Sequence, residues 1–489
     1  MAHPVNPFMT CRTLSRAIDY NFEANFWGLY ANNRLPQAQP QYRPILDFAP
    51  KAKVEAEFYG CPGLHYPGKI VPWGHGSTLA GEPWASMALH SNGVYLALNM
   101  VQEWEYSRNK TTLRDAVFPF CRDVLRFYQC WMTRRPDGSW VNENDQSNEC
   151  NPPAPITEAR KRAYCYQNNT IISNAFARRV ASALPAMAKA LGEPVDPQWE
   201  EMSLQLDPIP TVLTNGTPAM PWDPPRRVAV LAGSFTAPEP VTPGCATGAS
   251  VGCSTRQECG RCGAQVAGDG AMDTMTWPVF PGEAVSLGSP AALQQTMRNT
   301  LALSAEWTQG NSFCSIFSQA ARVGMPAEDW LPEWLAVLRT YSMTNMIVYQ
   351  SGGGIETVGA LQMVADLALQ SVTVPGTSGS TYLALFPLNT SFSDLRFHRL
   401  RGKGAFVVSA AWNSTSHRLQ GAITIEAEVG GPCSLHLPPW DGPHEPTLSV
   451  AVASGPRTGV PTKRVGTRWE FATTAGTTYT VTPKYARQT

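Results

Sequence analysis

The spacing of hydrophobic positions along the chain changes once, near residue 375. Before that point, apolar residues recur three and four positions apart over long windows, which is the spacing of one face of an α-helix. These windows predict helices at 80–107, 111–135, 168–191, 289–308, 311–324, 328–342 and 355–371. Loops rich in proline, glycine and asparagine separate them. We therefore expect mostly helix and loop over the first 375 residues.

After Pro375 the pattern becomes that of β-strands. Short runs such as GAFVVSAAW, GAITIEAEV and TYTVTP are rich in β-branched residues, often alternate, and are separated by turn residues. Because helices come first and strands afterwards, the order favours two domains rather than a parallel α/β sheet. We predict a mainly α fold, with a helical domain at 1–375 and a smaller C-terminal β-sandwich domain at 376–489.

The charge balance argues against polyanionic partners. The 489 residues include 38 basic and 38 acidic side chains, so the formal net charge is zero. Nucleic acids and anionic membrane surfaces select for basic patches, which this balance does not favour. No run approaches the roughly 18 apolar residues that a membrane span needs. We expect neither a nucleic acid nor a membrane as a partner.

Cysteines and glycosylation signals leave the compartment open. Twelve cysteines and five acceptor sequences are typical of a secreted protein, whereas the first residues, MAHPVNPFMT, lack the pattern of a signal peptide. The acceptor asparagines are Asn109, Asn168, Asn215, Asn389 and Asn413. An extracellular or secretory location is favoured if the chain is an N-terminally truncated fragment.

The sequence predicts no metal ion and no cofactor. A glycine-rich stretch contains Cys245, Cys253, Cys259 and Cys262, but only one Cys-x-x-Cys pair, which favours a disulfide-stapled insertion over a zinc site. The histidines show no metal-binding spacing. No phosphate-binding loop or dinucleotide fingerprint occurs either.

Acids and amides beside aromatic residues provide the remaining candidate chemistry. This is the residue mixture of sugar-cleaving sites, where aromatic rings stack on sugars and two carboxylates act as acid and base. Three segments contain it: DYNFEANFW at 19–27, NENDQSNEC at 142–150 and GGGIE at 352–356. Each also has a simpler interpretation, respectively a capped helix start, a polar surface loop and a first-turn carboxylate. Spacing alone leaves both interpretations open.

In their order along the chain, these segments resemble glycoside hydrolase family 95. This family of six-hairpin, (α/α)6-barrel glycosidases acts on α-L-fucosides and related α-L-galactosides. The first segment is similar to the family's Asn-x-Asn-x-x-x-Asn-Tyr-Trp motif, with Asp19 at the first asparagine and Asn21 at the second. Ser147-Asn148-Glu149 falls where the family's Ser-Pro-Glu motif carries the general acid. The resemblance implies an (α/α)6 toroid in which Asn21 and Asp19 position the base and Glu149 is the acid.

Further segments set the register of this resemblance. WPVFPG at 277–282 and Gln370-Ser371 look like family segments, and 396–412 is similar to a strand pattern of the family's C-terminal sandwich. This register places the family's catalytic aspartate at or beside Ile355 and Glu356, so we predict that Glu356 replaces the base. The resemblance implies inversion: Glu149 protonates the glycosidic oxygen while Glu356 activates water on the opposite sugar face.

The substrate expected from the resemblance is an oligosaccharide or polysaccharide. Trp27 and Trp73 are candidates for stacking on a sugar, and His75 is a candidate substrate ligand. Because the first motif is reached by residue 19, we expect the family's preceding β-domain to be absent here, which favours a fragment. Two other functions stay open: a non-catalytic carbohydrate-binding homologue and, with less support, a polysaccharide lyase.

Overall fold

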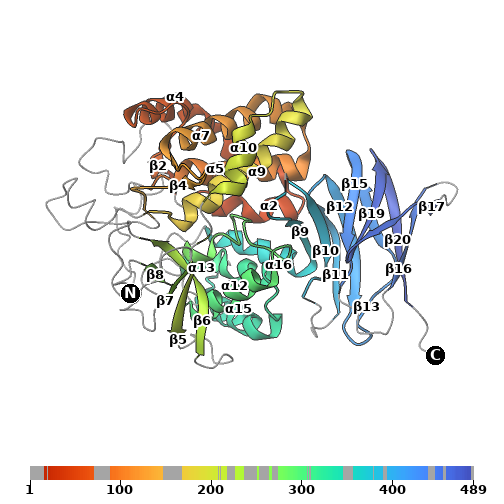
Figure 1. Ribbon diagram of the computed structural model, residues 1–489. Coiled ribbons are helices and arrows are strands. Elements are labelled where there is room, and N and C mark those ends of the chain that lie inside the picture. The colour runs from red at the N-terminus through yellow and green to blue at the C-terminus, as the bar shows by residue number, and fades with distance from the viewer. Residues whose placement is uncertain are drawn as a thin grey trace.

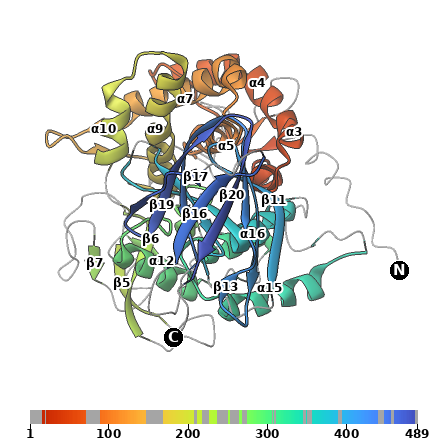
Figure 2. The same ribbon diagram turned by 90° about the vertical axis from the view of Figure 1, so that its right-hand side faces the viewer.

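The computed structural model places most of the chain in a helical body followed by β-sheets (Figure 1). It describes residues 16–18, 20–70, 89–146, 168–206, 209, 211–216, 226–235, 250–252, 264–266, 274–304, 307, 310–344, 348, 356–377, 379–388, 394–438, 446–454 and 459–485. Figures 1 and 2 agree in placing the C-terminal strands together on one side of the helical body. The expected helix-rich chain with a C-terminal β region is confirmed.

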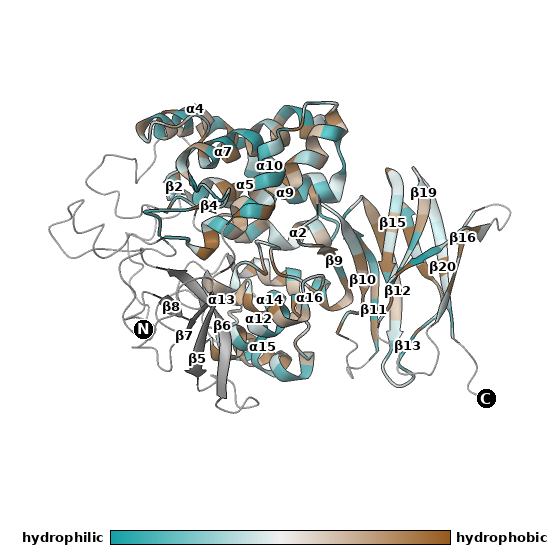
Figure 3. Cartoon of the chain, viewed as in Figure 1, coloured by the Kyte–Doolittle hydropathy of each residue, from teal (hydrophilic) through white to brown (hydrophobic). Residues whose placement is uncertain are grey.

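Most of the longer helices fall within the predicted windows, whereas the helices at 42–58 and 197–205 lie outside all of them. The longer ones are α4 (Tyr42–Phe58), α5 (Asn92–Ser107), α7 (Phe118–Trp131), α9 (Ile171–Leu191), α10 (Pro197–Gln205), α12 (Ala291–Leu303), α14 (Ile316–Arg322), α15 (Ala327–Tyr341) and α16 (Leu361–Ala368). The shorter turns are η1 (Ala24–Phe26), α2 (Trp27–Ala31), α3 (Leu35–Ala38), η2 (Gln39–Gln41), α6 (Lys110–Thr112), η3 (Leu113–Val117), η4 (Thr274–Thr276), α13 (Gly310–Phe313) and η6 (Glu356–Ala360). Hydrophilic and hydrophobic stretches occur together on helices such as α7 and α10, as one-sided burial requires (Figure 3).

Strands within the first 375 residues correct the expectation of helix and loop alone. A four-stranded sheet has the order β7-β5-β6-β8, with β5 and β7 parallel. Its strands are β5 (Thr211–Gly216), β6 (Arg226–Phe235), β7 (Ser250–Gly252) and β8 (Ala264–Val266). Two short pairs also occur: β1 (Arg16–Ala17) with β2 (Lys69–Ile70), and β3 (Thr133–Arg134) with β4 (Trp140–Val141). None of these strands has the long alternating pattern that would reveal it in the sequence.

The C-terminal strands form two sheets around a common core. One sheet has the order β18-β19-β15-β10-β9, and the other has β11-β12-β14-β20-β16-β17 with β13 beside β12. The strands are β9 (Leu369–Thr373), β10 (Thr381–Leu385), β11 (Leu395–Gly402), β12 (Phe406–Asn413), β13 (Arg418–Leu419), β14 (Ile423–Ala427), β15 (Gly430–His436), β16 (Thr447–Val452), β17 (Gly459–Val460), β18 (Lys463–Val465), β19 (Arg468–Thr474) and β20 (Thr477–Lys484). Alternate residues of β12, from Phe406 to Trp412, are buried in this core, as one face of a pleated sheet requires.

The helix predicted at 355–371 ends earlier than expected. α16 ends at Ala368, and Gln370 and Ser371 lie on β9 instead of ending the helix. All five residues of β9 are buried, and the strand pairs with β10. Its sequence, Leu-Gln-Ser-Val-Thr, buries polar and apolar residues alike, so burial leaves no alternating pattern by which the sequence could separate strand from helix here.

A disulfide joins two helix ends of the body. Cys61 lies three residues after α4, Cys130 lies in the last turn of α7, and their sulfur atoms are bonded across a sequence separation of 69.

Among the described residues, no helix combines the length and apolar character needed to cross a membrane.

Candidate functional site

The structure describes only part of the predicted site. Asn21, Trp27 and the backbone of Glu356 lie among the described residues. Asp19, Trp73, His75 and Glu149 lie outside the described residues, as does the cysteine cluster at 245–262. The described part of the site comprises the segments that carry Asn21 and Glu356 and the residues at 142–146, which precede Glu149.

The segment around Asn21 has an unusual backbone. Tyr20 has φ = 141°, a conformation that is costly for a bulky residue and that tends to cluster at functional sites. Tyr20 is buried, with its ring centroid 6.2 Å from that of Trp277. Asn21 is half-buried, and the Asn25 side-chain amide donates to its carbonyl oxygen at 2.6 Å. Packing thus holds the backbone immediately beside Asn21 in a strained conformation.

A chain of buried hydrogen bonds, the polar column, holds the same segment against α5. Glu23 is fully buried, and its carbonyl oxygen accepts a hydrogen bond from the Asn99 amide on α5 at 3.3 Å. That amide also donates to Gln41 Oε1 at 2.7 Å, and Gln41 Nε2 donates to the Tyr30 hydroxyl at 2.9 Å. Buried polar groups need such partners, so the column fixes the segment against α5. The alternation of polar residues points to Glu23, but Asn99 and Gln41 carry no local signal.

Two glycines bring the Glu356 segment against the Asn21 segment. A Cβ on Gly359 would lie 2.6 Å from the Ala24 carbonyl oxygen, and one on Gly28 would lie 2.9 Å from Leu361 Cβ. The turn η6 is therefore seated directly on η1 and α2. Glu356 is the first residue of η6, and a rise of roughly 2 Å per residue puts its backbone about 6 Å along the turn from Gly359.

Trp27 is a core residue, which corrects its predicted role as a platform for sugar stacking. Its side chain is 0% exposed. Its ring meets Phe280 edge-on at 5.0 Å and lies 6.3 Å from Tyr95. A sugar can stack only on an accessible ring face, so Trp27 contributes packing beneath η6 instead.

The polar segment leading toward Glu149 is more buried than a surface loop. Asn142, Asp145 and Gln146 are at most 1% exposed, whereas Glu143 and Asn144 are exposed. Asn142 and Asp145 are hydrogen-bonded to each other at 2.9 Å. The interpretation of this segment as a simple polar surface loop is therefore wrong for its described part, 142–146. Polar residues alone gave no signal that this part is buried.

Among the described residues, no group of three or more His, Cys, Asp or Glu side chains is arranged to hold a metal ion. The described histidines His65 and His90 instead form a buried pair, with Nε2 of the first 3.0 Å from Nδ1 of the second. Burial lowers the pKa of His90 to about 3. Both rings also pack against aromatic neighbours.

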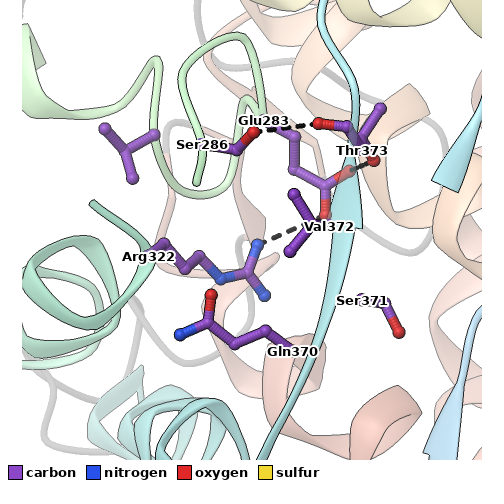
Figure 4. Close-up of a pocket in the computed structure, with 8 residues that line it drawn as sticks. Glu283, Ser286, Arg322, Gln370, Ser371, Val372 and Thr373 are labelled. Atoms are coloured by element: carbon purple, nitrogen blue, oxygen red, sulfur yellow. Dashed lines mark hydrogen bonds and ion pairs between the residues drawn. The ribbon is translucent and has the colours of Figure 1, made fainter. Parts of the chain in front are cut away.

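A small polar cavity lies at the junction of the helices with β9 (Figure 4). Glu283, Arg322, Gln370 and Ser371 are among its lining residues, and its volume of about 10 Å³ has room for one water molecule. It is too small for a sugar. The family-like segments at 277–282 and 370–371 thus border a structural junction.

Glu283 and Arg322, which line this cavity, belong to a cluster of six buried charges. The cluster comprises three carboxylates and three cations: Glu105, Glu283, Asp366, Arg179, Arg322 and Lys403. Burial by itself raises the pKa of Glu283, but the cations reverse this effect and hold its pKa below the ordinary carboxyl range. Burial raises the pKa of Asp366 despite its ion pair with Arg322. This cluster joins the helical body to β9 and to the turn between β11 and β12.

One family model matches the N-terminal part of the chain. Residues 15–217 match the family model described as "Glycosyl hydrolase family 95 catalytic domain". The matched range contains Asn21 and Glu149 but ends before Glu356. The resemblance to family 95 is confirmed. No curated protein matches the chain.

Two solved structures are among those to which the chain is similar. A putative kojibiose phosphorylase from the human microbiome has 9% identity and a TM-score of 0.48, with 95% of this chain and 60% of that chain covered. The Streptomyces avermitilis α-L-rhamnosidase, solved with L-rhamnose, has 11% identity and a TM-score of 0.42, with coverage of 95% and 38%. The chain therefore spans less than two thirds of either protein. At these scores neither likeness carries an argument about activity.

Proposed function

Because residues 15–217 match the family 95 catalytic domain, we propose that this protein is a glycoside hydrolase that cleaves an α-L-fucoside or a related α-L-galactoside with inversion. Its substrate is an oligosaccharide or polysaccharide, and it uses no cofactor. The observation that carries the proposal is the family match over a range that includes both Asn21 and Glu149. The contact of η6 with η1 supports it, because η6 begins at Glu356 and packs against Ala24, three residues after Asn21.

We assign the general acid to Glu149 and the general base to Glu356. Glu149 gives its proton to the glycosidic oxygen, and Glu356 takes a proton from the water that attacks the anomeric carbon. Asn21 and Asp19 orient the base and that water. In an inverting enzyme the two carboxyl groups lie about 6.5 to 9.5 Å apart, leaving room for the water. Trp73 and His75 are the proposed sugar contacts.

The proposed architecture is an (α/α)6 toroid at 1–375 followed by the β-sandwich at 376–489. The helices of the first part of the chain and the separate core of the C-terminal sheets support a division into two domains, with β9 already part of the C-terminal sheets. The disulfide Cys61–Cys130 supports an oxidising compartment, because such bonds persist mainly outside the cytosol.

A non-catalytic carbohydrate-binding homologue is the second candidate function. Asp19 and Glu356 favour it, because the resemblance places them where the family has an asparagine and an aspartate. Sugar binding without release of product would support this alternative. A polysaccharide lyase would instead produce an unsaturated product, detected as ultraviolet absorbance on uronic-acid polymers.

The first test measures hydrolysis of a panel of aryl glycosides of fucose, galactose, glucose and rhamnose. The second measures the activity of variants of the two acids. Glu149→Gln and Glu356→Gln should each reduce kcat by about 10²- to 10⁴-fold on a natural glycoside. Glu143→Gln, on the same polar segment, and Glu328→Gln, in the first turn of α15, are exposed controls that should keep full activity. Full activity in either acid variant would refute its assignment.

A further inference from the structure

One buried carboxylate near the proposed acid has no role in the mechanism above. Asp145 is 0% exposed, and three groups donate hydrogen bonds to it. The His90 backbone N–H donates to Oδ1 at 3.0 Å, and the Asn142 amide donates to Oδ2 at 2.9 Å. The Thr170 hydroxyl also donates to Oδ2. Burying a carboxylate is costly unless it is well hydrogen-bonded, so this arrangement stabilises one particular backbone path.

The three donors come from separate parts of the fold. His90 immediately precedes Ser91, the N-cap of α5, and Thr170 is the N-cap of α9. Asn142 follows β4. The Thr170 side chain makes no capping bond to its own helix; its hydroxyl is directed to Asp145 instead. The carboxylate therefore connects the starts of two helices to the strand that leads toward Glu149.

Hydrogen bonds join residues 142–146 to residues 168–170, and these two stretches form the neck of the segment that carries Glu149. The Asn169 N–H donates to the Asn142 carbonyl oxygen at 2.7 Å, and the Asn142 N–H donates to Asn169 Oδ1 at 3.2 Å. The Asn144 N–H donates to Asn168 Oδ1 at 3.2 Å. The two ends of the intervening segment are thus bonded together, and Glu149 lies four residues after Asp145.

His90, whose N–H donates to Asp145, is itself held by buried contacts. The Tyr128 hydroxyl donates to the His90 carbonyl oxygen, and His65 contacts the His90 ring. All three groups are buried. Helix α5, which begins beside His90, reaches Asn99 about 10 Å further along at a rise of 1.5 Å per residue. Asn99 supports the Glu23 backbone. Helix α5 therefore connects the Asp145 carboxylate, four residues before Glu149 in the sequence, to the segment that carries Asn21.

We propose that Asp145 is a positioning residue for the general acid: by fixing the neck at 142–146 and 168–170, its carboxylate sets where Glu149 delivers a proton. This inference rests on the proposed function. A displacement of about 1 Å at a catalytic group can cost a factor of about 10² in rate. Loss of the Asp145 anchor therefore weakens proton delivery without removing the acid itself.

A misplaced acid has a kinetic signature that a general loss of stability lacks. A 4-nitrophenolate leaves with little protonation, whereas an alkoxide leaving group needs the acid's proton as the bond breaks. Positioning variants should therefore be slow on a methyl glycoside and nearly normal on the 4-nitrophenyl glycoside of the same sugar. A variant that only lowers the folded fraction slows both substrates by the same factor.

The experiment compares Asp145→Ala, Asp145→Asn and Asp137→Asn in the full chain on both glycosides. Asp137 is an exposed turn carboxylate that accepts bonds from Ser139, so it is a matched control and should leave both rates unchanged. Asp145→Ala should lower kcat about 10²-fold on the methyl glycoside and less than about threefold on the 4-nitrophenyl glycoside, at unchanged KM. Asp145→Asn should lie in between, because the amide keeps one acceptor oxygen.

Equal losses on both glycosides, or no loss, would overturn the proposal. If Asp145→Ala does not fold, Asp145→Asn and Thr170→Val, which removes one donor, decide the question by the same ratio of rates. Glu149→Gln is measured in parallel to separate the two claims. If Glu149→Gln shows no selective loss on the methyl glycoside, the acid assignment fails. If Glu149→Gln shows that loss and the Asp145 variants do not, only the positioning role fails.

Discussion

Lys403 provides the sharpest test of how the helical body and the β-sheets are joined. It lies in the turn between β11 and β12 and is fully buried. Its Nζ contacts Glu105 Oε2 at 2.9 Å and Thr373 Oγ1 at 2.8 Å, and it also forms an ion pair with Glu283. Lys403→Met keeps most of the side-chain length and removes only the charge and its donors.

The magnitude follows from the composition of the cluster. With Lys403 present, three carboxylates face three cations; without it, one buried negative charge lacks compensation. Removing one partner of a buried ion pair typically costs about 3 to 5 kcal/mol. Arg179 still contacts both Glu105 and Glu283 in the variant. We therefore expect a loss near the lower end, about 3 kcal/mol at pH 7.

The pH dependence has a definite sign. The folded state holds the pKa of Glu283 below its ordinary value of 4.5, so its contribution to stability is present above pH 4.5 and is lost as the pH falls toward the folded pKa. Lys403→Met raises that folded pKa. The stability difference between wild type and variant should therefore be largest near neutral pH and should narrow in acid.

The assay is equilibrium urea unfolding followed by tryptophan fluorescence at pH 7 and in acid. Lys463→Met, at an exposed position on β18, is the control and should change stability by less than about 0.5 kcal/mol. A loss below about 1 kcal/mol for Lys403→Met at pH 7, or a loss that grows in acid, would refute the reasoning.

Three further predictions concern the disulfide, the contact beneath η6 and the buried histidine. Replacing Cys61 and Cys130 by serine should cost about 4 kcal/mol in the chain-entropy model for a loop of this length, measured by unfolding with and without reductant; an unchanged stability would argue against the bond. Gly359→Ala places a Cβ 2.6 Å from a backbone oxygen of η1, so it should cost about 1 to 3 kcal/mol and lower kcat, whereas Gly459→Ala, with open space around it, should do neither. Burial lowers the pKa of His90 from its ordinary value of 6.5 to about 3, so stability should fall as the pH drops from 6.5 toward 3, and its NMR signals should not titrate between about pH 5 and 8; a midpoint near 6.5 would contradict its burial.

Much of the secondary structure could be predicted because one-sided burial leaves a local pattern. The window at 168–191 became α9, which begins at Ile171, and the run at 404–412 became β12. The same logic failed at β9, where every residue is buried and the pattern loses its period. Strands β5 to β8 pair partly across long connections, and that pairing leaves no local trace.

The site was less predictable because its supports are long-range. Lys403 has the sequence character of an exposed turn lysine, yet it is buried against acids 120 and 298 residues earlier in the chain. Asp145 is part of a polar run whose burial depends on Thr170 and His90. Trp27 is the last residue of a sugar-site motif but packs against Phe280. In each case the decisive partner is distant, and residue type alone does not identify it.

The anomeric form of the first product tests the central claim most directly. Proton NMR recorded during the first minutes of hydrolysis of an aryl α-L-fucoside, before mutarotation, distinguishes the two stereochemical outcomes. If Glu149 and Glu356 act as acid and base across one sugar, the β-anomer should appear first. Initial release of the α-anomer would contradict the single-displacement mechanism and the roles assigned to both residues.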